Sequence, residues 1–400
     1  MTKDPVTREE LHEEQPPQAA VPEQEPRGAA RARVLLRQVL LPASAIVLSL
    51  VVGAVIMIAS SPLVRGDIDL SLPLTAYWAL LNGSLGSFNA IVSTLVQATP
   101  LILAGLAVGI GFKAGLFNIG AQGQFLMGAL AAATMGVATA DLPPLIAIPV
   151  ALAAGMAAGL AYGFIPGFLK AYTGAHEVVT TIMLNYVAIQ LVAYVISGPL
   201  RGANVTFART EAITSAALPV IAGRDGHIGL LFAAVAVPIM AWMLFRSTLG
   251  FEIRTVGANP DAARYAGMHP RLLIILALSL GGLLAGLAGA TEILGQVRHM
   301  PAAYATAVGF DAIAVALLGR AHPVGILFAG LLFGAMRAGA GLMQIQAGIP
   351  VQMVNVLQAV ILFFLAADLI VRAIFRLRAA GVGVDEMQTI TRSYGEQTAK

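Results

Sequence analysis

Uncharged amide side chains stand in stretches of this chain that are otherwise almost wholly apolar. Asn118, Gln122 and Gln124 follow one another closely, and Asn185 lies in a later stretch. An amide both donates and accepts hydrogen bonds without charge, which suits contact with the hydroxyls or ring edges of a neutral polar solute. Amides also bridge neighbouring helices in membranes, so the residues alone leave both roles open. Further amides of this kind are Gln97, Gln296, Asn355 and Gln358.

Few carboxylates accompany these amides. Glu292 and Asp311 lie in apolar stretches and are candidates for contact with a polar solute, although Asp311 also suits the start of a half-helix. Asp368 precedes Arg372 by four residues, a spacing at which the two would pair on one helix face. A carrier driven by an ion gradient usually buries acids along its path. No two acids here form an obvious proton relay, which disfavours that class without excluding it.

The sequence lacks the motifs of covalent and nucleotide chemistry. It contains no cysteine, no histidines at metal-ligand spacing and no G-x-x-x-x-G-K-[ST] motif for ATP phosphates. We therefore expect no catalytic residue, no metal site and no cofactor. If ATP drives this protein, another subunit must hydrolyse it.

The composition determines the fold class. The chain of 400 residues is 58% hydrophobic and only 11% charged, with a mean hydropathy of +0.81. A soluble protein carries roughly 25% charged residues, and apolar runs of about 20 residues, enough to cross a bilayer, recur here. We predict an all-α, polytopic membrane protein with about ten transmembrane helices and broken helices along a central path. The predicted spans are 38–60, 89–112, 119–140, 145–169, 177–197, 227–245, 272–296, 306–319, 323–342 and 352–371.

The two ends of the chain differ from its middle. Residues 1–34 are rich in Glu, Gln and Pro and are predicted to be a disordered cytoplasmic N-terminus, and residues 379–400 a polar cytoplasmic tail. The predicted membrane domain then covers 35–378. Fourteen Lys and Arg residues flank the segments assigned to the cytoplasmic side and six, counting Arg337, the other side. This bias predicts a multi-pass protein with both termini in the cytoplasm, and it accounts for the basic pI without any nucleic acid.

A short polar segment interrupts the apolar pattern between the sixth and seventh predicted spans. Asn259 and Pro260 form a helix-start signal, Asp261 suits the first turn, and Gly267 ends the helix. We predict a cytoplasmic helix over 259–268 that presents Asn259, Asp261 and Arg264 as polar contacts, and Ala262, Ala263, Tyr265, Ala266 and Met268 as apolar ones, to a soluble partner. The alternative is an amphipathic linker lying on the membrane surface.

A glycine-rich stretch separates the second and third predicted spans. Residues 111–128 read GFKAGLFNIGAQGQFLMG, and their glycines and amides would interrupt a helix. Backbone outside a helix at membrane depth must be buried in protein or line a water-filled cavity. We predict a constriction in the path here, with Asn118 capping the half-helix that follows; a simple cytoplasmic glycine turn is the alternative.

Four runs, in order, carry a family resemblance: KAGLFNIGAQGQFLMGALAA, HEVVTTIMLNYVA at 176–188, TVGANPDAARYAGM and LSLGGLLAGLAGA. Together they resemble the permease subunits of bacterial ABC importers, in the family that also holds ribose and branched-chain amino acid permeases. The first two runs resemble the branch associated with nucleoside uptake. The resemblance covers about 89–371, and His176 departs from it, because Asn is more usual there.

The resemblance implies a function and a set of partners. A G-x-N-x-x-AA-x-x-x-G run matches the family's coupling loop, which implies docking on a cytoplasmic ATP-binding subunit through Gly257, Asn259, Asp261, Ala262, Ala263, Tyr265 and Gly267. It also implies a second related permease subunit, an extracytoplasmic substrate-binding protein and a bacterial plasma membrane. We expect an ATP-driven importer of nucleosides or a related ribose-containing or simple-sugar solute. An ion-gradient-driven carrier of a small polar solute is the alternative.

Overall fold

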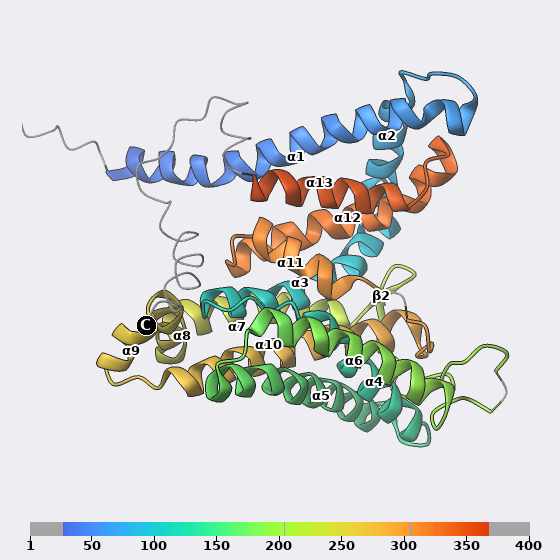
Figure 1. Cartoon of the computed structure of the whole chain (residues 1–400). Helices are drawn as coiled ribbons and strands as arrows, with labels where there is room; N and C mark the ends of the chain where they lie inside the picture. Colours follow the sequence, from blue (N-terminus) through green and yellow to red (C-terminus); the bar gives the residue numbers. More distant parts are fainter. Residues whose placement is uncertain (1–26, 204, 305, 368–400) are drawn as a thin grey trace, which may run out of the picture.

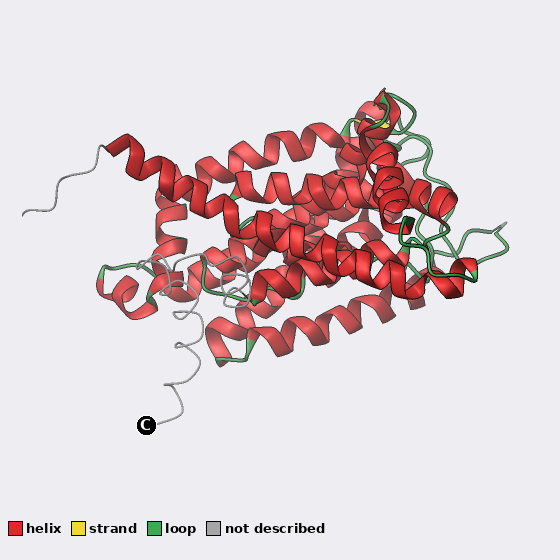
Figure 2. Cartoon of the chain, turned by 90° about the horizontal axis from the view of Figure 1, so that it is seen from above, coloured by secondary structure: helices red, strands yellow, loops and turns green. Residues whose placement is uncertain are grey.

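The structure, a computed structural model, is a bundle of long helices (Figure 1), and it describes residues 27–203, 205–304 and 306–367. Loops gather at the two ends of the bundle (Figure 2). The helices are α1 Arg27–Arg65, α2 Leu72–Leu85, α3 Phe88–Lys113, α4 Ala121–Ala138, α5 Pro144–Thr173, α6 Glu177–Ser197, α7 Gly229–Arg246, α8 Thr248–Ala258, α9 Pro260–Tyr265, α10 Pro270–Glu292, the π-helix η1 Ile293–Val297, α11 Val308–Leu318, α12 Pro323–Ala347 and α13 Gln352–Ala366.

Each of the ten predicted spans coincides with one helix of the structure. Seven helices are long and apolar enough to cross a membrane: α1, α3, α5, α6, α7, α10 extended by η1, and α12. The helices α11 and α13 are apolar but shorter, and α4 has 18 residues. A polytopic all-α protein is confirmed, whereas the number of ten crossings stays a prediction.

One boundary and two helices differ from the predicted elements. The helix α1 begins at Arg27, eight residues before the predicted start of the membrane domain. The helices α2 and α8 were missed: α2 has 14 residues, too few to span, and α8 has 11 residues with a polar face. The predicted Asp368–Arg372 pair and the polar tail lie outside the described residues.

Helix α3 lies at the centre of the bundle and packs against α10, α11 and α12. In Figure 1, α1, α12 and α13 lie on one side of it and α4, α5, α6 and α10 on the other. The start of α1, together with α8 and α9, lies at one end of the bundle. The hairpin β1–β2, Val220–Ala222 with Gly226–His227, lies at the opposite end.

Glycines bring α4, α5 and α10 into backbone contact. A Cβ added at Gly159 would lie 2.2 Å from the carbonyl oxygen of Gly282, and one at Gly128 would lie 2.3 Å from the Cα of Gly286. Only residues without side chains permit this approach. The regularly spaced glycines of the sequence therefore form the interfaces between these helices. We call Gly128, Gly155, Gly159, Gly163, Gly282 and Gly286 the glycine layer.

Candidate functional site

The α8–α9 segment is built by two successive caps. The Ser247 hydroxyl accepts from the Gly250 N–H at the start of α8, and Asn259 Oδ1 accepts from the N–H groups of Asp261 and Ala262, both at 3.0 Å, at the start of α9. The Asn259 cap is thus confirmed. The helix covers only 260–265, and Gly267 turns the chain away with a φ of +82°.

The exposed face of this segment differs in part from the prediction. Tyr265 is 97% exposed, and Asp261 and Arg264 form an exposed ion pair of 3.0 Å. Ala262 and Gly267 are exposed as well, but Ala263 is fully buried. The predicted partner contact by Ala263 is therefore wrong, because this methyl anchors α9 to its own chain.

A groove of about 340 Å³ lies beside α9, between α8 and the start of α10. Its walls combine apolar and polar side chains, and Phe251 and Leu272 are each 55% exposed. A groove with exposed aromatic and aliphatic walls beside an exposed Tyr265 suits a soluble partner. The described lining residues are Thr248, Leu249, Phe251, Glu252, Ala266, Gly267, Met268, His269, Leu272, Leu273 and Leu276.

Gly257 connects the α8–α9 segment to the loop between α3 and α4. A Cβ added at Gly257 would lie 2.3 Å from the carbonyl oxygen of Lys113, and one at Gly115 would lie 2.8 Å from the carbonyl oxygen of Gly257. Gly115 also has a φ of +70°, which side chains rarely tolerate. The backbone of α8 therefore lies directly against the loop that leads to Asn118.

Asn118 follows Gly115 by three residues and pairs with Gln124. Asn118 Nδ2 donates to Gln124 Oε1 at 3.1 Å, and Gln124 Nε2 donates back to Asn118 Oδ1 at 3.3 Å. Both side chains are about 1% exposed. The prediction that Asn118 caps the following helix is wrong: Gly120 occupies the N-cap of α4 and no side chain caps it.

Gln122 and Asn185 are also bonded inside the chain. Gln122 Nε2 donates to the Thr306 carbonyl at 2.9 Å, and its Oε1 accepts from the Gly309 N–H at 2.8 Å. Asn185 Oδ1 accepts from the Gly123 N–H at 2.8 Å, and its Nδ2 donates to the Ile119 carbonyl at 3.0 Å.

We call Asn118, Gln122, Gln124 and Asn185 the amide cluster. Each member uses both its donor and its acceptor within the protein, which is the bridging alternative left open by the sequence. The cluster ties the α3–α4 loop to α6 and to the start of α11. Contact between these amides and a solute stays a prediction, and it requires bonds of this conformation to open.

A second group of polar side chains comes from the end of α10, the loop before α11, and the helices α11 and α12. The Tyr304 hydroxyl donates to Glu292 Oε1 at 2.5 Å, and Arg337 forms an ion pair with Asp311. The side chains of Asp311 and Arg337 are 23% and 21% exposed, and Arg337 also interacts electrostatically with Glu292. We call Glu292, Tyr304, Asp311 and Arg337 the charged cluster.

The charged cluster joins two predicted residues to two that were missed. The charge count assigned Arg337 to the non-cytoplasmic side, but Arg337 lies in the interior of α12. The isolated position of Arg337 in an apolar helix could have indicated an ion pair, because a charge at that depth needs a partner. The adjoining π-helix η1 is a type of irregularity often found at functional sites. Partly exposed carboxylate and guanidinium groups there can hydrogen-bond a polar solute.

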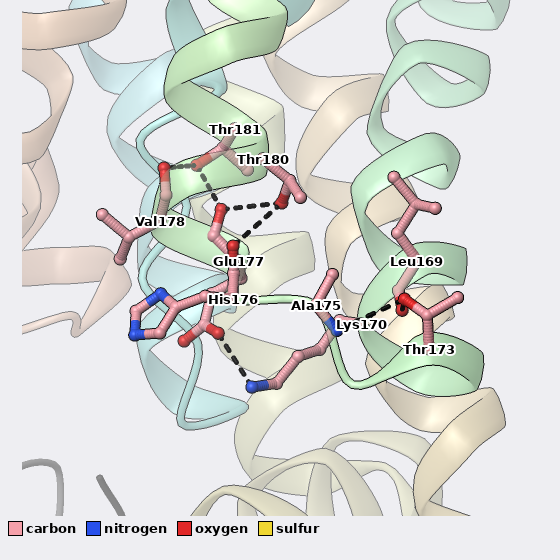
Figure 3. A network of polar contacts seen from close by, with 9 residues as sticks. All are labelled: Leu169, Lys170, Thr173, Ala175, His176, Glu177, Val178, Thr180 and Thr181. Carbon is pink, nitrogen blue, oxygen red and sulfur yellow. Dashed lines mark hydrogen bonds and ion pairs between the residues drawn. The ribbon is translucent and has the colours of Figure 1, made fainter.

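The HEVVTT run fastens the turn between α5 and α6 (Figure 3). Lys170 Nζ of α5 lies 2.9 Å from Glu177 Oε2 at the start of α6, and the Glu177 side chain is fully buried. The hydroxyls of Thr180 and Thr181 donate to backbone carbonyls of the same turn, at 3.1 Å and 2.7 Å to that of Glu177. This motif therefore joins two helices, and the substitution at His176 falls at its edge.

Comparison with known proteins gives one family and several relatives. Residues 90–366 match the family described as "Branched-chain amino acid transport system / permease component". The chain is 40% identical over 342 residues to the guanosine ABC transporter permease protein NupP of Bacillus subtilis, covering 84% of this chain and 95% of that one. It is 36% identical to the glucose ABC transporter permease protein TsgB13 of Haloferax volcanii, covering 86% and 90%.

A third relative carries a similar name. The nucleoside ABC transporter permease protein NupB of Lactococcus lactis is 38% identical, with 84% of this chain and 92% of the relative covered. Each of the three organisms also has a second, more distant permease match, at 23% to 28% identity. No solved structure gives a significant match.

Proposed function

This chain belongs to the branched-chain amino acid transport system / permease component family, and we propose that it imports a nucleoside or a related ribose-containing or simple-sugar solute. It is a membrane-embedded ABC-transporter permease subunit, as its relatives are. The energy would come from ATP hydrolysed by a separate subunit, since the sequence has no P-loop. The names of the relatives, guanosine and glucose among them, support this range of solutes.

One observation carries the proposed contact with the ATPase. The α8–α9 segment exposes Tyr265 almost completely, beside a groove, while Gly257 holds the segment against the α3–α4 loop. An exposed aromatic beside a groove is a typical anchor for a partner. The ATP-binding subunit would grip α9 in the cytoplasm, with both chain termini on the same side of a bacterial plasma membrane.

Motion of the α8–α9 segment would be transmitted to the solute path through the amide cluster. A displaced α8 would push on Gly115, and the hydrogen bonds of Asn118 and Gln122 lie just beyond it. Opening these bonds would loosen the α3–α4 loop from α6 and α11. The solute would meet the charged cluster by weak, partly exposed contacts, which permit release as well as entry.

The proposed importer requires two further partners. A second related permease would complete the membrane core, and an extracytoplasmic substrate-binding protein would deliver the solute to the end of the bundle that carries the β1–β2 hairpin. The ion-gradient carrier receives no support from the relatives. Asp311, the acid it would most need, is paired with Arg337.

The proposal is tested by co-purification of the full complex and by ATP-driven uptake in proteoliposomes, comparing wild type with Tyr265→Ala. Phe207→Ala is the matched control, because it also removes an aromatic ring that is 82% exposed, in the loop between α6 and β1. We expect Tyr265→Ala to lower ATPase recovery about tenfold, as loss of an interface anchor does. Phe207→Ala should leave that recovery unchanged. Solute uptake by the chain alone, under an ion gradient and without any ATPase, would contradict the proposal.

A further inference from the structure

Helix α6 carries polar groups on the face that it turns away from the bundle. Its inner face, with Asn185, Ala188 and Val192, packs on α4 and more lightly on α5. On the other face Tyr186 is 63% and Tyr194 72% exposed, and Gln190 between them is exposed as well. These three positions are spaced by four residues, so they form one stripe along the helix. They line a shallow hollow together with Val187 and Leu191.

The depth of Gln190 is unfavourable for contact with lipid. The span α6 covers Glu177–Ser197, so Gln190 lies three residues past its midpoint, about 5 Å along the axis. Hydrocarbon extends about 15 Å to either side of the bilayer centre. Within the described residues the Gln190 amide and the hydroxyls of Tyr186 and Tyr194 make no hydrogen bond. An amide left unpaired in hydrocarbon is strongly disfavoured.

The outward faces of α5 and α7 carry no amide side chain. The exposed large side chains of α5 are Leu145, Ile146, Leu160, Phe164, Ile165, Phe168 and Tyr172, and those of α7 are Leu231, Val235, Ile239 and Trp242. The polar atoms among them are the Tyr172 hydroxyl and the Trp242 ring nitrogen, each near the end of its helix, where tyrosine and tryptophan suit the membrane interface. Lipid is a suitable neighbour for α5 and α7. The α6 stripe needs a neighbour that can form hydrogen bonds.

We propose that the stripe of Tyr186, Gln190 and Tyr194 is the surface on which the second, related permease subunit packs. This inference rests on the proposed function, which requires two permeases. It is supported by the second permease match from each of the three organisms named above. A helix of that subunit can supply polar partners at membrane depth, which a lipid tail cannot.

The surface is tested by photo-crosslinking in membranes that contain all subunits. A benzophenone amino acid replaces Tyr186 or Gln190, and in control variants it replaces Phe164 on α5 or Val235 on α7. We expect a crosslink to the second permease from both α6 positions and only lipid adducts from the controls. Crosslinks to a second copy of this chain, only lipid adducts from α6, or a permease crosslink confined to the controls would each overturn the proposed surface.

A substitution gives a second readout. Gln190→Leu is expected to leave membrane insertion and the thermal stability of the isolated chain unchanged, since the side chain is exposed there. Recovery of the second permease should fall about threefold, the equivalent of the ~0.6 kcal/mol average for one hydrogen bond between membrane helices. Val235→Ala on α7 is the control. Unchanged recovery with Gln190→Leu would count against the surface.

The two proposals fail separately. If the chain co-purifies with an ATPase and drives ATP-dependent uptake but α6 gives no permease crosslink, the surface is wrong and the transporter assignment stands. If no ATPase or second permease associates with the wild-type chain, the proposed function fails and the inferred surface fails with it.

Discussion

The glycine layer and the α8–α9 segment hold their neighbours in opposite ways. In the glycine layer, backbones of α4, α5 and α10 meet at several successive turns, with Gly159 against Gly282 and Gly128 against Gly286. Helix α9 is largely exposed, and α8 meets the α3–α4 loop at one glycine contact, Gly257 with Gly115. Repeated close contacts hold α4, α5 and α10 together as a rigid body. A single contact between α8 and the loop can transmit a displacement of α8 and still leave α8 free to move. The difference suggests which part of the chain stays fixed during transport and which part moves.

The largest effect is expected in the glycine layer. A Cβ at Gly286 would lie 2.4 Å from the Gly155 carbonyl oxygen, so Gly286→Val must force α5 and α10 apart. We expect almost no monodisperse protein in size-exclusion chromatography. Gly341→Val is the control, because no atom lies within 4 Å of a Cβ there. Equal yields of the two variants would show that the layer is not rigid.

The charged cluster should also respond strongly. Arg337→Leu leaves Asp311 without its ion-pair partner, and we expect a loss of about 3 kcal/mol in the free energy of unfolding. The double variant Asp311→Leu/Arg337→Leu removes both charges and should recover much of that loss. Thermal unfolding in detergent compares the two. A double variant less stable than the single one would mean that the pair is not the main interaction of Arg337.

The tightly packed region extends to His227, whose ring lies against Gly295 of η1. The side chain is 1% exposed, and this burial, aided by the positive charge of Arg298, lowers the pKa of His227 from 6.5 to about 4. Between these values the unfolded loop binds a proton that the folded loop does not. Stability of the hairpin region should therefore fall as the pH drops from 6.5 to 4, by up to about 3 kcal/mol.

Hydrogen exchange of the Leu218 amide, which donates to the Leu294 carbonyl, measures this loss of stability. The variant His227→Asn keeps an acceptor for the Gly229 N–H but does not titrate. Protection that declines equally in wild type and variant would assign the pH effect to another group.

A substitution at Gly257 is expected to lower stability only slightly but to abolish ATP-driven uptake. The Cβ of Gly257→Ala would lie 2.3 Å from the Lys113 carbonyl oxygen and 2.7 Å from the Ala114 carbonyl carbon, which displaces α8 from the loop. We expect a loss of about 1–2 kcal/mol in stability. The ATPase should still bind, since Tyr265 is untouched, but ATP-driven uptake should be lost. Ala258→Ser, at the exposed neighbouring position, is the control. Normal uptake by Gly257→Ala would show that the contact between Gly257 and the α3–α4 loop is not needed to couple ATP hydrolysis to transport.

The sequence predicted the elements better than the contacts between them. Hydropathy located ten helices, and the Asn259–Pro260 signal located α9, because both depend on residues near one another in the chain. Helix α2 was missed because its 14 residues are too few for a membrane span. The role of Gln122 depends on Thr306 and Gly309, more than 180 residues away, and no local pattern encodes that pairing. Ala263 shows the same limit, because only the packed structure reveals that it faces inward.

The most direct test of the account uses the absence of cysteine from the sequence. A single Tyr265→Cys variant can be labelled with a membrane-impermeant maleimide in intact cells and in inside-out vesicles, with and without the ATP-binding subunit. We predict labelling only in the inside-out vesicles, and protection of the thiol when the ATP-binding subunit is present. Labelling in intact cells, or no protection by that subunit, would contradict the assignment of α9 as its docking site.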